Sequence, residues 1–516
     1  MTVDESRRPP RTRPVRPRLR DRWRPSILAS GRFPPPSLGW SDLSPLALSR
    51  REFTVRGATL FLMATFLASA VLGAVRQVLL GAQFGANETT GAFRAASQFP
   101  DVLFTLVAGG ALSSALLPVL AATRRDAGEA AAWRLASLVL NALVVTLLVA
   151  SVAGLFTAPW LVRQVILPEY SPTAQDLAIT MTRIMLIQPV VLGAGTVITA
   201  WLNSRNRFFL PAIGVACHNV GILAGIGAAI VLPGVGIWGP VWGVVGGAVL
   251  QVSLTAFGLI GEGAGSQWVP RIDLADRGLR NVALLLVPNG ISTGVNYAGG
   301  LVETSFGSRV DNAATLVALQ NAWLVAGLTV TLLGAAIGQA TFPRMAAYAA
   351  AGAGDAFGRL VSRALAIGML GSLPVVAVLL LAGDRVVALL FEHGAYDADA
   401  TRLTQRILVA YVIGLPFYIG TEIAGRAILA TRDARTPLLT NAMQLAIRTG
   451  TMAAFLPVWG FLAIPLAFAI SSAIESAVLI WQARRRTDSL RPPDVATGSG
   501  PVMAGSDAGS GRTPAG

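Results

Sequence analysis

The chain has 516 residues, of which 53% are hydrophobic and 13% are charged, and its mean hydropathy is +0.60. A soluble protein of this length needs a larger charged fraction, so the composition excludes a water-soluble globular enzyme and favours a membrane protein. The formal net charge of +14 does not indicate a nucleic-acid partner, because the arginines lie at the chain ends and in short segments between apolar runs.

Both ends of the chain are poor in apolar side chains. Residues 1–57 are rich in Arg and Pro, and residues 487–516 are rich in Gly, Ser, Pro and Ala. Such segments bury too little apolar surface to offset the entropy of ordering, so we predict a disordered cytoplasmic tail at each end.

Twelve apolar segments between the tails are long enough to cross about 30 Å of hydrocarbon as helices. The first six form a predicted N-lobe, residues 58–270: Ala58–Leu80, Val102–Ala122, Ala136–Leu155, Ala178–Trp201, Leu210–Leu232 and Ile237–Ile260. The other six form a predicted C-lobe, residues 271–486: Ala283–Thr304, Ala313–Phe342, Val361–Ala382, Ile407–Ala430, Leu438–Phe455 and Gly460–Trp481. The sequence therefore predicts an all-α integral membrane fold with about 12 transmembrane helices in two six-helix lobes.

The arginines between these segments gather in alternate loops. Arginine accumulates on the cytoplasmic side of membrane proteins, so the rich loops are assigned inside and the poor loops outside. The inner set includes Arg124, Arg205, Arg271, Arg359, Arg432 and Arg484–Arg486, and the outer set includes Arg94, Arg163, Arg309 and Arg402. We therefore expect a multi-pass protein of a bacterial plasma membrane with both termini in the cytoplasm.

The two halves of the chain resemble each other at a shift of about 225 residues, which is the mark of an internal repeat. Matching landmarks are Leu117-Pro118 with Phe342-Pro343, Ser204–Arg207 with Thr431–Arg435, and Leu232-Pro233 with Leu456-Pro457. Repeats of six spans have the same orientation, so the lobes should be pseudo-symmetric about an axis along the membrane normal. The substrate path is expected in the cleft between them.

Four stretches carry a resemblance to a known family. They are Val71–Arg76 with Phe84–Ala86, Gly109–Ser113 and Leu117–Leu120; Leu202–Phe208; Leu390–Asp397; and Gly414–Pro416 with Ala430–Pro437. They are similar to the MurJ (MviN) family, the lipid II flippases of the multidrug, oligosaccharidyl-lipid and polysaccharide exporter superfamily. The resemblance implies that superfamily's fold, and transport of a polyprenyl-diphosphate-linked glycan from the inner to the outer leaflet.

The chain departs from the family pattern at several positions where relatives have charged residues. The uncharged residues there are Ala70, Gln77, Gly91, Phe104, Thr105 and Gly109, and no charge occurs from Asn312 to Pro343. The two further C-terminal spans common in lipid II flippases have no counterpart before residue 516. The cleft is therefore expected to hold fewer cations than that of its relatives.

Charged side chains within the apolar spans are candidates for the transport path, because each costs about 2.5–3.5 kcal/mol to insert. We expect Arg76, Arg426 and His218 to bind substrate, since an Arg fork can hold a phosphate through two hydrogen bonds. The alternatives are that Arg76 snorkels to the interface, that Arg426 forms only a structural ion pair with Glu422, and that His218 is a core residue.

Glu303 and Glu422 are the candidates for binding a coupling H⁺ or Na⁺, although Glu303 is equally compatible with a surface carboxylate. Arg448 and Glu475 are predicted to pair with each other as scaffold. The sequence has no phosphate-cradling Gly-Lys-Ser or Gly-Lys-Thr loop, no His pair at metal-ligand spacing and one cysteine, Cys217. We therefore expect a monomeric protein that is not an enzyme and has no catalytic residue, metal or cofactor.

Three functions fit these observations. The first is a flippase that moves a lipid-linked glycan by alternating access of the two lobes, with Arg76 and Arg426 on the diphosphate. The second is a cation-coupled antiporter of amphipathic small molecules, in which Glu303 or Glu422 exchanges protons. The third is a membrane scaffold that keeps the fold but transports nothing.

Overall fold

The computed structural model describes residues 55–108, 110–260, 268–310 and 312–490. Helices dominate these residues, and no β-strand occurs among them. The predicted tails, residues 1–57 and 487–516, lie almost wholly outside the described part of the chain.

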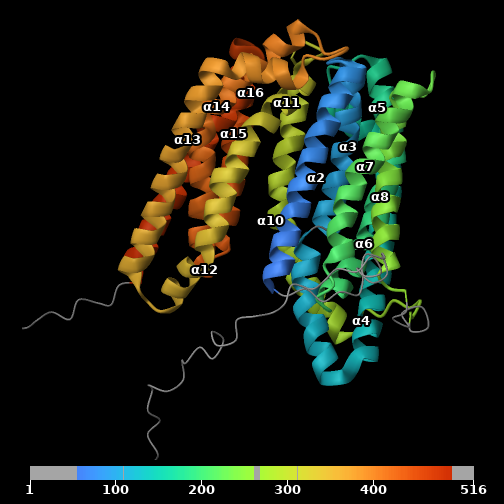
Figure 1. The fold of residues 1–516 in the computed structure, drawn as a ribbon, viewed down its shortest axis with the longest axis vertical. Helices are drawn as coiled ribbons and strands as arrows, with labels where there is room; N and C mark the ends of the chain where they lie inside the picture. Colours follow the sequence, from blue (N-terminus) through green and yellow to red (C-terminus); the bar gives the residue numbers. More distant parts are fainter. Residues whose placement is uncertain (1–54, 109, 261–267, 311, 491–516) are drawn as a thin grey trace, which may run out of the picture. The chain divides into compact units, whose positions relative to one another are not determined.

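The helices of the first half follow the predicted apolar segments (Figure 1). They are α2 (Val55–Phe84), α3 (Glu88–Ala108), α4 (Gly110–Trp160), η2 (Leu161–Ile166), α5 (Pro172–Met185), α6 (Ile187–Asn203), α7 (Phe209–Val231) and α8 (Trp238–Phe257). Pro172 lies in the first turn of α5, where its missing N–H is not needed, and the Ser171 hydroxyl caps that helix by accepting from the Ala174 N–H.

The helices of the second half do the same. They are α10 (Arg277–Gly307), α11 (Thr315–Thr329), η3 (Val330–Ala335), α12 (Ala336–Ala350), α13 (Gly354–Phe391), α14 (Ala398–Ala430), α15 (Arg435–Trp459), η4 (Gly460–Leu462) and α16 (Ala463–Ser489). Aspartates cap two of them, since Asp276 accepts from the Leu279 N–H at 3.0 Å and Asp397 from the Ala400 N–H at 2.9 Å.

Nine helical stretches in the described residues are long and apolar enough to cross a membrane, and two of them, Ala115–Ile166 and Arg435–Ser489, include parts of two predicted segments each. Each of the twelve predicted segments overlaps a described helix, with one correction of position. The second begins at about Glu88 rather than Val102, because α3 starts there and α4 continues its path. Gly128, with φ 87°, then reverses the chain within α4.

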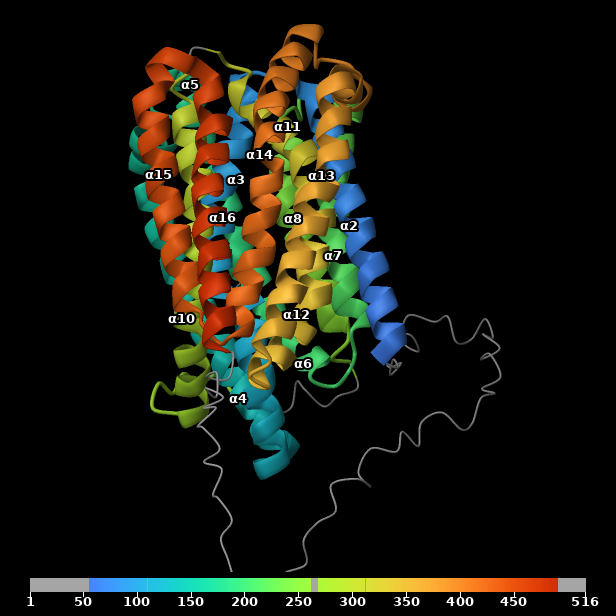
Figure 2. The same ribbon diagram turned by 90° about the vertical axis from the view of Figure 1, so that its left-hand side faces the viewer.

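Alternate connections meet at the same end of the structure. Figure 2 shows that α2 begins and α16 ends at one end, which we call the proximal end; the opposite end is the distal end. At the proximal end, Arg205 pairs with Glu129 at 2.9 Å and Arg486 pairs with Asp433 at 2.6 Å. The predicted grouping of the arginine-rich loops is therefore confirmed.

Backbone conformation confirms the internal repeat. Asn206 and Arg432, with φ 59° and 64°, are the two non-glycine residues with positive φ in the described chain, and they fall in the matched Ser204 and Thr431 landmarks. Gly128 matches Gly352, and Gly236 matches Gly460, with positive φ at all four. Each pair is separated by about 225 residues, so the same turns recur in both halves.

The helix α10 packs on both halves of the molecule. It contacts α3 and α4 from the first half as well as α15 from the second. Gly290 and Gly294 allow this approach, since a Cβ on either would lie within 2.6 Å of Leu106. The predicted seventh span therefore joins the lobes rather than packing against the C-lobe alone.

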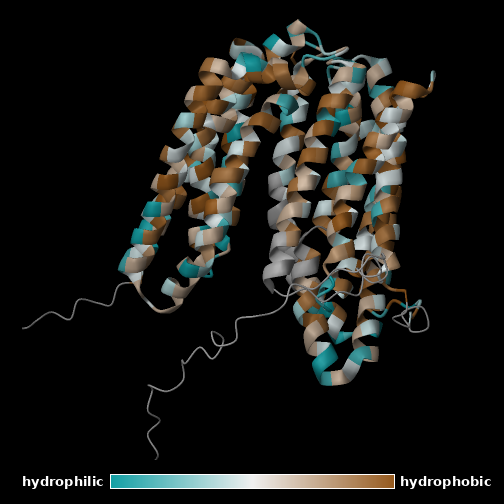
Figure 3. Ribbon diagram, in the orientation of Figure 1, coloured by the Kyte–Doolittle hydropathy of each residue, from teal (hydrophilic) through white to brown (hydrophobic). Residues whose placement is uncertain are grey.

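The surface of the helices is apolar, as lipid contact requires. Figure 3 shows hydrophobic residues along the helices and hydrophilic residues at the bend of α4 and at the proximal end of α13. Side chains such as Phe156, Leu381 and Leu389 are exposed by 79%, 86% and 76%. Close packing instead depends on small residues, most clearly where glycines bring α7 against α8.

Candidate functional site

A central cavity of about 710 Å³ lies between the halves of the molecule, where the sequence predicts the substrate path. Helices α2 and α3 line one side, and α10, α11, α13 and α14 line the other. Its polar lining residues are Arg76, Gln77, Gln98, Glu303, Thr304 and Gln320. The remaining wall is mostly apolar and aromatic, including Trp323, Leu328 and Tyr411, so the cavity presents a few polar groups within an apolar surface.

Arg76 also lines a second, smaller cavity of about 110 Å³ inside the first half, together with His218. Two of the predicted substrate-binding residues thus meet there. Asp101 lies in the same cavity and accepts a hydrogen bond from the Gln188 side chain at 3.1 Å. Arg76 forms no ion pair within 4.0 Å among the described residues, although the Asp101 carboxylate is near enough to attract its charge, and Arg76 also lines the central cavity.

Arg94 is a buried cation that the sequence assigns to an outer loop, and that assignment is wrong. It lies inside α3 and is 4% exposed. Its guanidinium donates hydrogen bonds to the Gln320 and Asn321 side chains of α11, the second at 3.3 Å, and Gln77 donates to the same Asn321 oxygen at 3.1 Å. We call these four side chains the distal latch, because they join α2 and α3 to α11 near the distal end.

Further contacts close the distal end around this latch. The turn after α2 meets the turn after α13, where the Ala395 N–H donates to the Ala82 carbonyl at 2.7 Å. Gly85 and Gly394 have positive φ and face each other's turns so closely that a Cβ on Gly394 would lie 2.3 Å from the Ala82 oxygen. Only glycine fits both requirements at these positions.

A tyrosine outside the apolar segments adds to this closure. Burial, with the Glu88 carboxylate nearby, raises the pKa of the Tyr170 hydroxyl. The hydroxyl therefore stays protonated and donates to the Ala313 carbonyl at 3.5 Å.

Glu303 of α10 lines the central cavity, and residues of α14 and α15 contact its carboxylate. The Tyr411 hydroxyl donates to its carboxylate at 3.3 Å, and the Arg448 guanidinium lies 3.9 Å away. Arg448 also donates to the Gly299 carbonyl and lies 4.8 Å over the Phe468 ring. The predicted pairing of Arg448 with Glu475 is therefore wrong, because Glu303 approaches it from α10.

The predicted pair of Glu422 and Arg426 is present on α14, with an N–O distance of 2.6 Å. Both residues line a third cavity, of about 550 Å³, within the second half. Arg448 and Glu475 line it as well, and so does Trp323, which separates it from the central cavity. Arg76 and Arg426 thus lie in different cavities, and the structure does not bring them together on one ligand.

The sequence misses Arg94 and Asp101 as cavity residues, although a signal for them exists. Arg94, Gln98 and Asp101 recur at i, i+4 and i+7, which places three polar side chains on one helix face. The second predicted span begins at Val102, so hydropathy places this stripe in a loop. Among the described residues no group of three or more His, Cys, Asp or Glu is placed to hold a metal ion.

Comparison with known proteins gives relatives along most of the chain. It is 29% identical over 453 residues to the lipid II flippase MurJ of Burkholderia cenocepacia, covering 85% of this chain and 84% of that protein. It is 26% identical over 446 residues to a probable lipid II flippase MurJ of Rhizobium tropici, covering 86% and 82%.

Solved structures share the fold. A lipid II flippase MurJ in an inward closed conformation matches with a TM-score of 0.71 and 22% identity over 84% of this chain and 90% of that one. An inward-facing multidrug resistance MATE family transporter of the MOP superfamily matches with a TM-score of 0.70 and 14% identity, over 82% and 95%. The family model of lipid II flippase MurJ matches residues 80–498, and the chain belongs to that family of membrane transporters.

Proposed function

We propose that this protein moves lipid II, a polyprenyl-diphosphate-linked glycan, from the inner to the outer leaflet of a bacterial plasma membrane. The observation that carries the proposal is the central cavity between the two halves, which presents Arg76 and several amides within apolar walls. A diphosphate needs cationic donors, and a glycan needs amide and hydroxyl partners. The apolar wall suits the beginning of a prenyl chain.

The proximal end faces the cytoplasm in this proposal. The arginine-rich loops, the start of α2 and the end of α16 lie there, and the positive-inside rule places such loops in the cytoplasm. The distal latch then closes the outer side, so the central cavity is shielded from the periplasm in this conformation.

Arg76 is the proposed first contact for the diphosphate, since it lines the central cavity and forms no ion pair within 4.0 Å among the described residues. Arg94 is held by amides in the latch and becomes available as a second cation when the lobes part. His218 lines the small cavity together with Arg76, and it is proposed to orient the Arg76 side chain or a bound phosphate.

The pair of Arg426 and Glu422 is proposed as a second binding site for the substrate phosphate, in the second half of the molecule. Arg426 would exchange its carboxylate for a substrate phosphate, and Glu422 would then take up H⁺ or Na⁺. Glu303 is the other proposed coupling site, because its carboxylate faces the central cavity while Tyr411 and Arg448 hold it from behind. The protein is proposed to work as a monomer and without a cofactor.

Complementation of a bacterial strain depleted of its own lipid II flippase tests the proposal. We expect the full chain to restore growth, and a protein-level control must show equal membrane insertion. Failure to restore growth with normal insertion would contradict it. Proton-coupled export of amphipathic cations from the same cells would then identify an antiporter, and no transport of either kind would leave a scaffold.

A further inference from the structure

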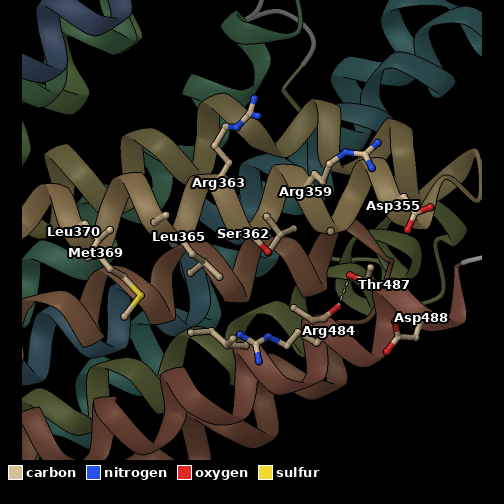
Figure 4. Close-up of a pocket in the computed structure, with 15 residues that line it drawn as sticks. Asp355, Arg359, Ser362, Arg363, Leu365, Met369, Leu370, Arg484, Thr487 and Asp488 are labelled. Atoms are coloured by element: carbon tan, nitrogen blue, oxygen red, sulfur yellow. Dashed lines mark hydrogen bonds between the residues drawn. The ribbon is translucent and has the colours of Figure 1, made fainter.

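A groove of about 850 Å³ lies at the proximal end of the second half, between α13 and α16 and apart from the three cavities above (Figure 4). The two helices touch at its mouth, since a Cβ on Gly358 would lie 2.6 Å from the Thr487 methyl group. In Figure 4, Ser362, Leu365 and Met369 lie on the side of α13 that faces α16. The groove opens along the two helices beyond that contact.

Three arginines line the groove: Arg359 and Arg363 from α13, and Arg484 from α16. Arg359 and Arg363 are one turn apart on the same helix face. All three side chains are exposed, and within the described part of the chain none of them forms an ion pair within 4.0 Å. Two carboxylates, Asp355 and Asp488, also line the groove, so the arginines leave a net positive charge.

The groove changes from cationic to apolar along the helix axis. From Arg359 to Leu370 the helix rises by about 16 Å, at about 1.5 Å per residue. Leu365, Met369, Leu370 and Ile480 form the apolar part. Leu370 is 64% exposed, which leaves this wall open to the acyl region of the bilayer. The arginines therefore lie at the proximal end of the groove, and the apolar part follows them along the two helices.

We propose that this groove binds an anionic phospholipid of the cytoplasmic leaflet. The arginines hold the phosphate, and the apolar wall takes the upper part of an acyl chain. Basic pockets between transmembrane helices on the cytoplasmic side suit lipid head groups in this way. The proposal rests on the orientation given above, with the proximal end in the cytoplasm, but it requires no transport activity.

A soluble anion and a partner helix are the competing occupants. A phosphate ion needs the arginines but gains nothing from Leu370 or Ile480. An apolar partner helix gains nothing from the three arginines and two aspartates of the groove, and it would have to bury their charges. Only a ligand with a negative head and an apolar tail uses the whole groove.

Native mass spectrometry of the purified full chain, titrated with phosphatidylglycerol or phosphatidylcholine, tests the proposal. Each arginine near the head group contributes about 1 kcal/mol, or about a fivefold change in affinity. We expect phosphatidylglycerol to bind at least tenfold more tightly than phosphatidylcholine. The combined variant Arg359→Gln, Arg363→Gln and Arg484→Gln should abolish this preference.

The matched control is Arg134→Gln, Arg277→Gln and Arg280→Gln, which removes the same charge from exposed proximal residues outside the groove. This variant should keep the preference. The variant Leu370→Asn should weaken the binding of both lipids and leave the preference for phosphatidylglycerol unchanged. The proposal is overturned if the groove and control variants behave alike, if inorganic phosphate displaces the lipid, or if the groove variant instead releases a co-purified protein. None of these readouts depends on lipid II, so the flippase proposal stands or falls separately.

Discussion

Single residues determine how firmly the distal end is closed. Arg94 is buried, yet its partners in the described structure are the amides of Gln320 and Asn321 rather than a carboxylate. Hydrogen bonds from a charged donor contribute about 1.5–3 kcal/mol, whereas separating a buried ion pair costs more. The latch is therefore strong enough to favour the closed state and weak enough to open.

Removing the Arg94 charge should open the distal end. In Arg94→Gln, the latch loses at least one charged hydrogen bond, so the closed state weakens by about 1.5–3 kcal/mol. On a Cys217→Ser background, a cysteine at Leu319 in the central cavity should react about 10- to 100-fold faster with an impermeant maleimide added outside. Arg163→Gln, which removes an exposed distal arginine paired with Asp176, is the control and should not change the rate. Equal rates in both variants would refute the latch.

Variants of the Glu422–Arg426 pair on α14 can distinguish a structural role of the pair from a role in transport. Glu422→Gln or Arg426→Gln leaves one charge without the partner that it has on α14, so each single variant should unfold at a lower temperature. The double variant should regain stability because neither charge remains. Lipid II transport should stay impaired in all three. Normal transport by both single variants would show that the pair has no part in the cycle.

The sequence predicts some site residues well and others not at all. Arg76, His218 and Glu303 are found because an isolated charge or imidazole in an apolar run has a high insertion cost, and all three line cavities. Whether they act on substrate stays a prediction. The pairing of Arg448 is missed because partners on different helices depend on helix rotation, which local sequence does not fix.

Helix elements pack through small side chains, since lipid removes most of the hydrophobic drive for association. At the interface of α7 and α8, a Cβ on Gly225 would lie 2.2 Å from the Gly239 carbonyl oxygen, and one on Gly221 would lie 2.3 Å from the Gly247 Cα. These are backbone contacts that cannot rotate away. The glycines therefore fix the distance between the two helices.

A side chain at Gly225 should push these helices apart. We expect Gly225→Val to destabilise the protein by about 1–3 kcal/mol, the usual cost of overpacking. Gly227 lies on the same helix with nothing within 4 Å of its Cβ position, so Gly227→Val is the matched control. Denaturant unfolding in detergent compares the two. A loss as large in Gly227→Val would mean that helix propensity, not packing, causes the effect.

At the proximal end, an ion pair between Asp433 and Arg486 joins the α14–α15 turn to α16. Burial alone would raise the pKa of the Asp433 carboxyl, but hydrogen bonds from Thr436 and Arg486 outweigh it, and the pKa is lowered. A carboxyl with a lowered folded pKa stabilises the protein above its unfolded pKa of about 3.9. That stabilisation is lost as the pH falls through the folded pKa.

Asp433→Asn should therefore reduce stability at pH 7 by about 1 kcal/mol and have a smaller effect at lower pH. Thermal unfolding between pH 7 and pH 3 measures the difference between variant and wild type. Asp176→Asn removes an exposed distal carboxylate that pairs with Arg163, and it should change stability little. A deficit in Asp433→Asn that stays constant across this range would contradict the assigned pKa.

Element positions are predicted well where apolar runs are long, and poorly where a helix begins with polar residues. The stretch from Glu88 to Asp101 mixes charges, amides and small residues, so hydropathy alone assigns it to a loop. Tertiary contacts make it a helix, because its polar face finds partners on α10 and α11. The same polar face carries the latch.

At the scale of the whole molecule, the repeat in the sequence predicts the architecture. Recurring turns at Asn206 and Arg432 show that both halves follow the same path, which hydropathy and Pro landmarks already indicate. The position of α10 against α3 and α4 is not predictable in this way. It depends on which lobe offers the better fit to small residues such as Gly290 and Gly294.

Lipid II is proposed to cross the membrane through the cavity lined by Arg76. The most direct measurement uses purified protein in liposomes, and follows the rate at which lipid II of the inner leaflet becomes accessible to an impermeant reagent outside. We predict rapid exposure with the wild-type chain. Arg76→Gln should be about 10- to 100-fold slower, from loss of about 1.5–3 kcal/mol of charged hydrogen bonding. Arg309→Gln, which alters an exposed distal arginine, should match the wild type. A wild-type rate equal to that of protein-free liposomes would show that the protein does not move lipid II.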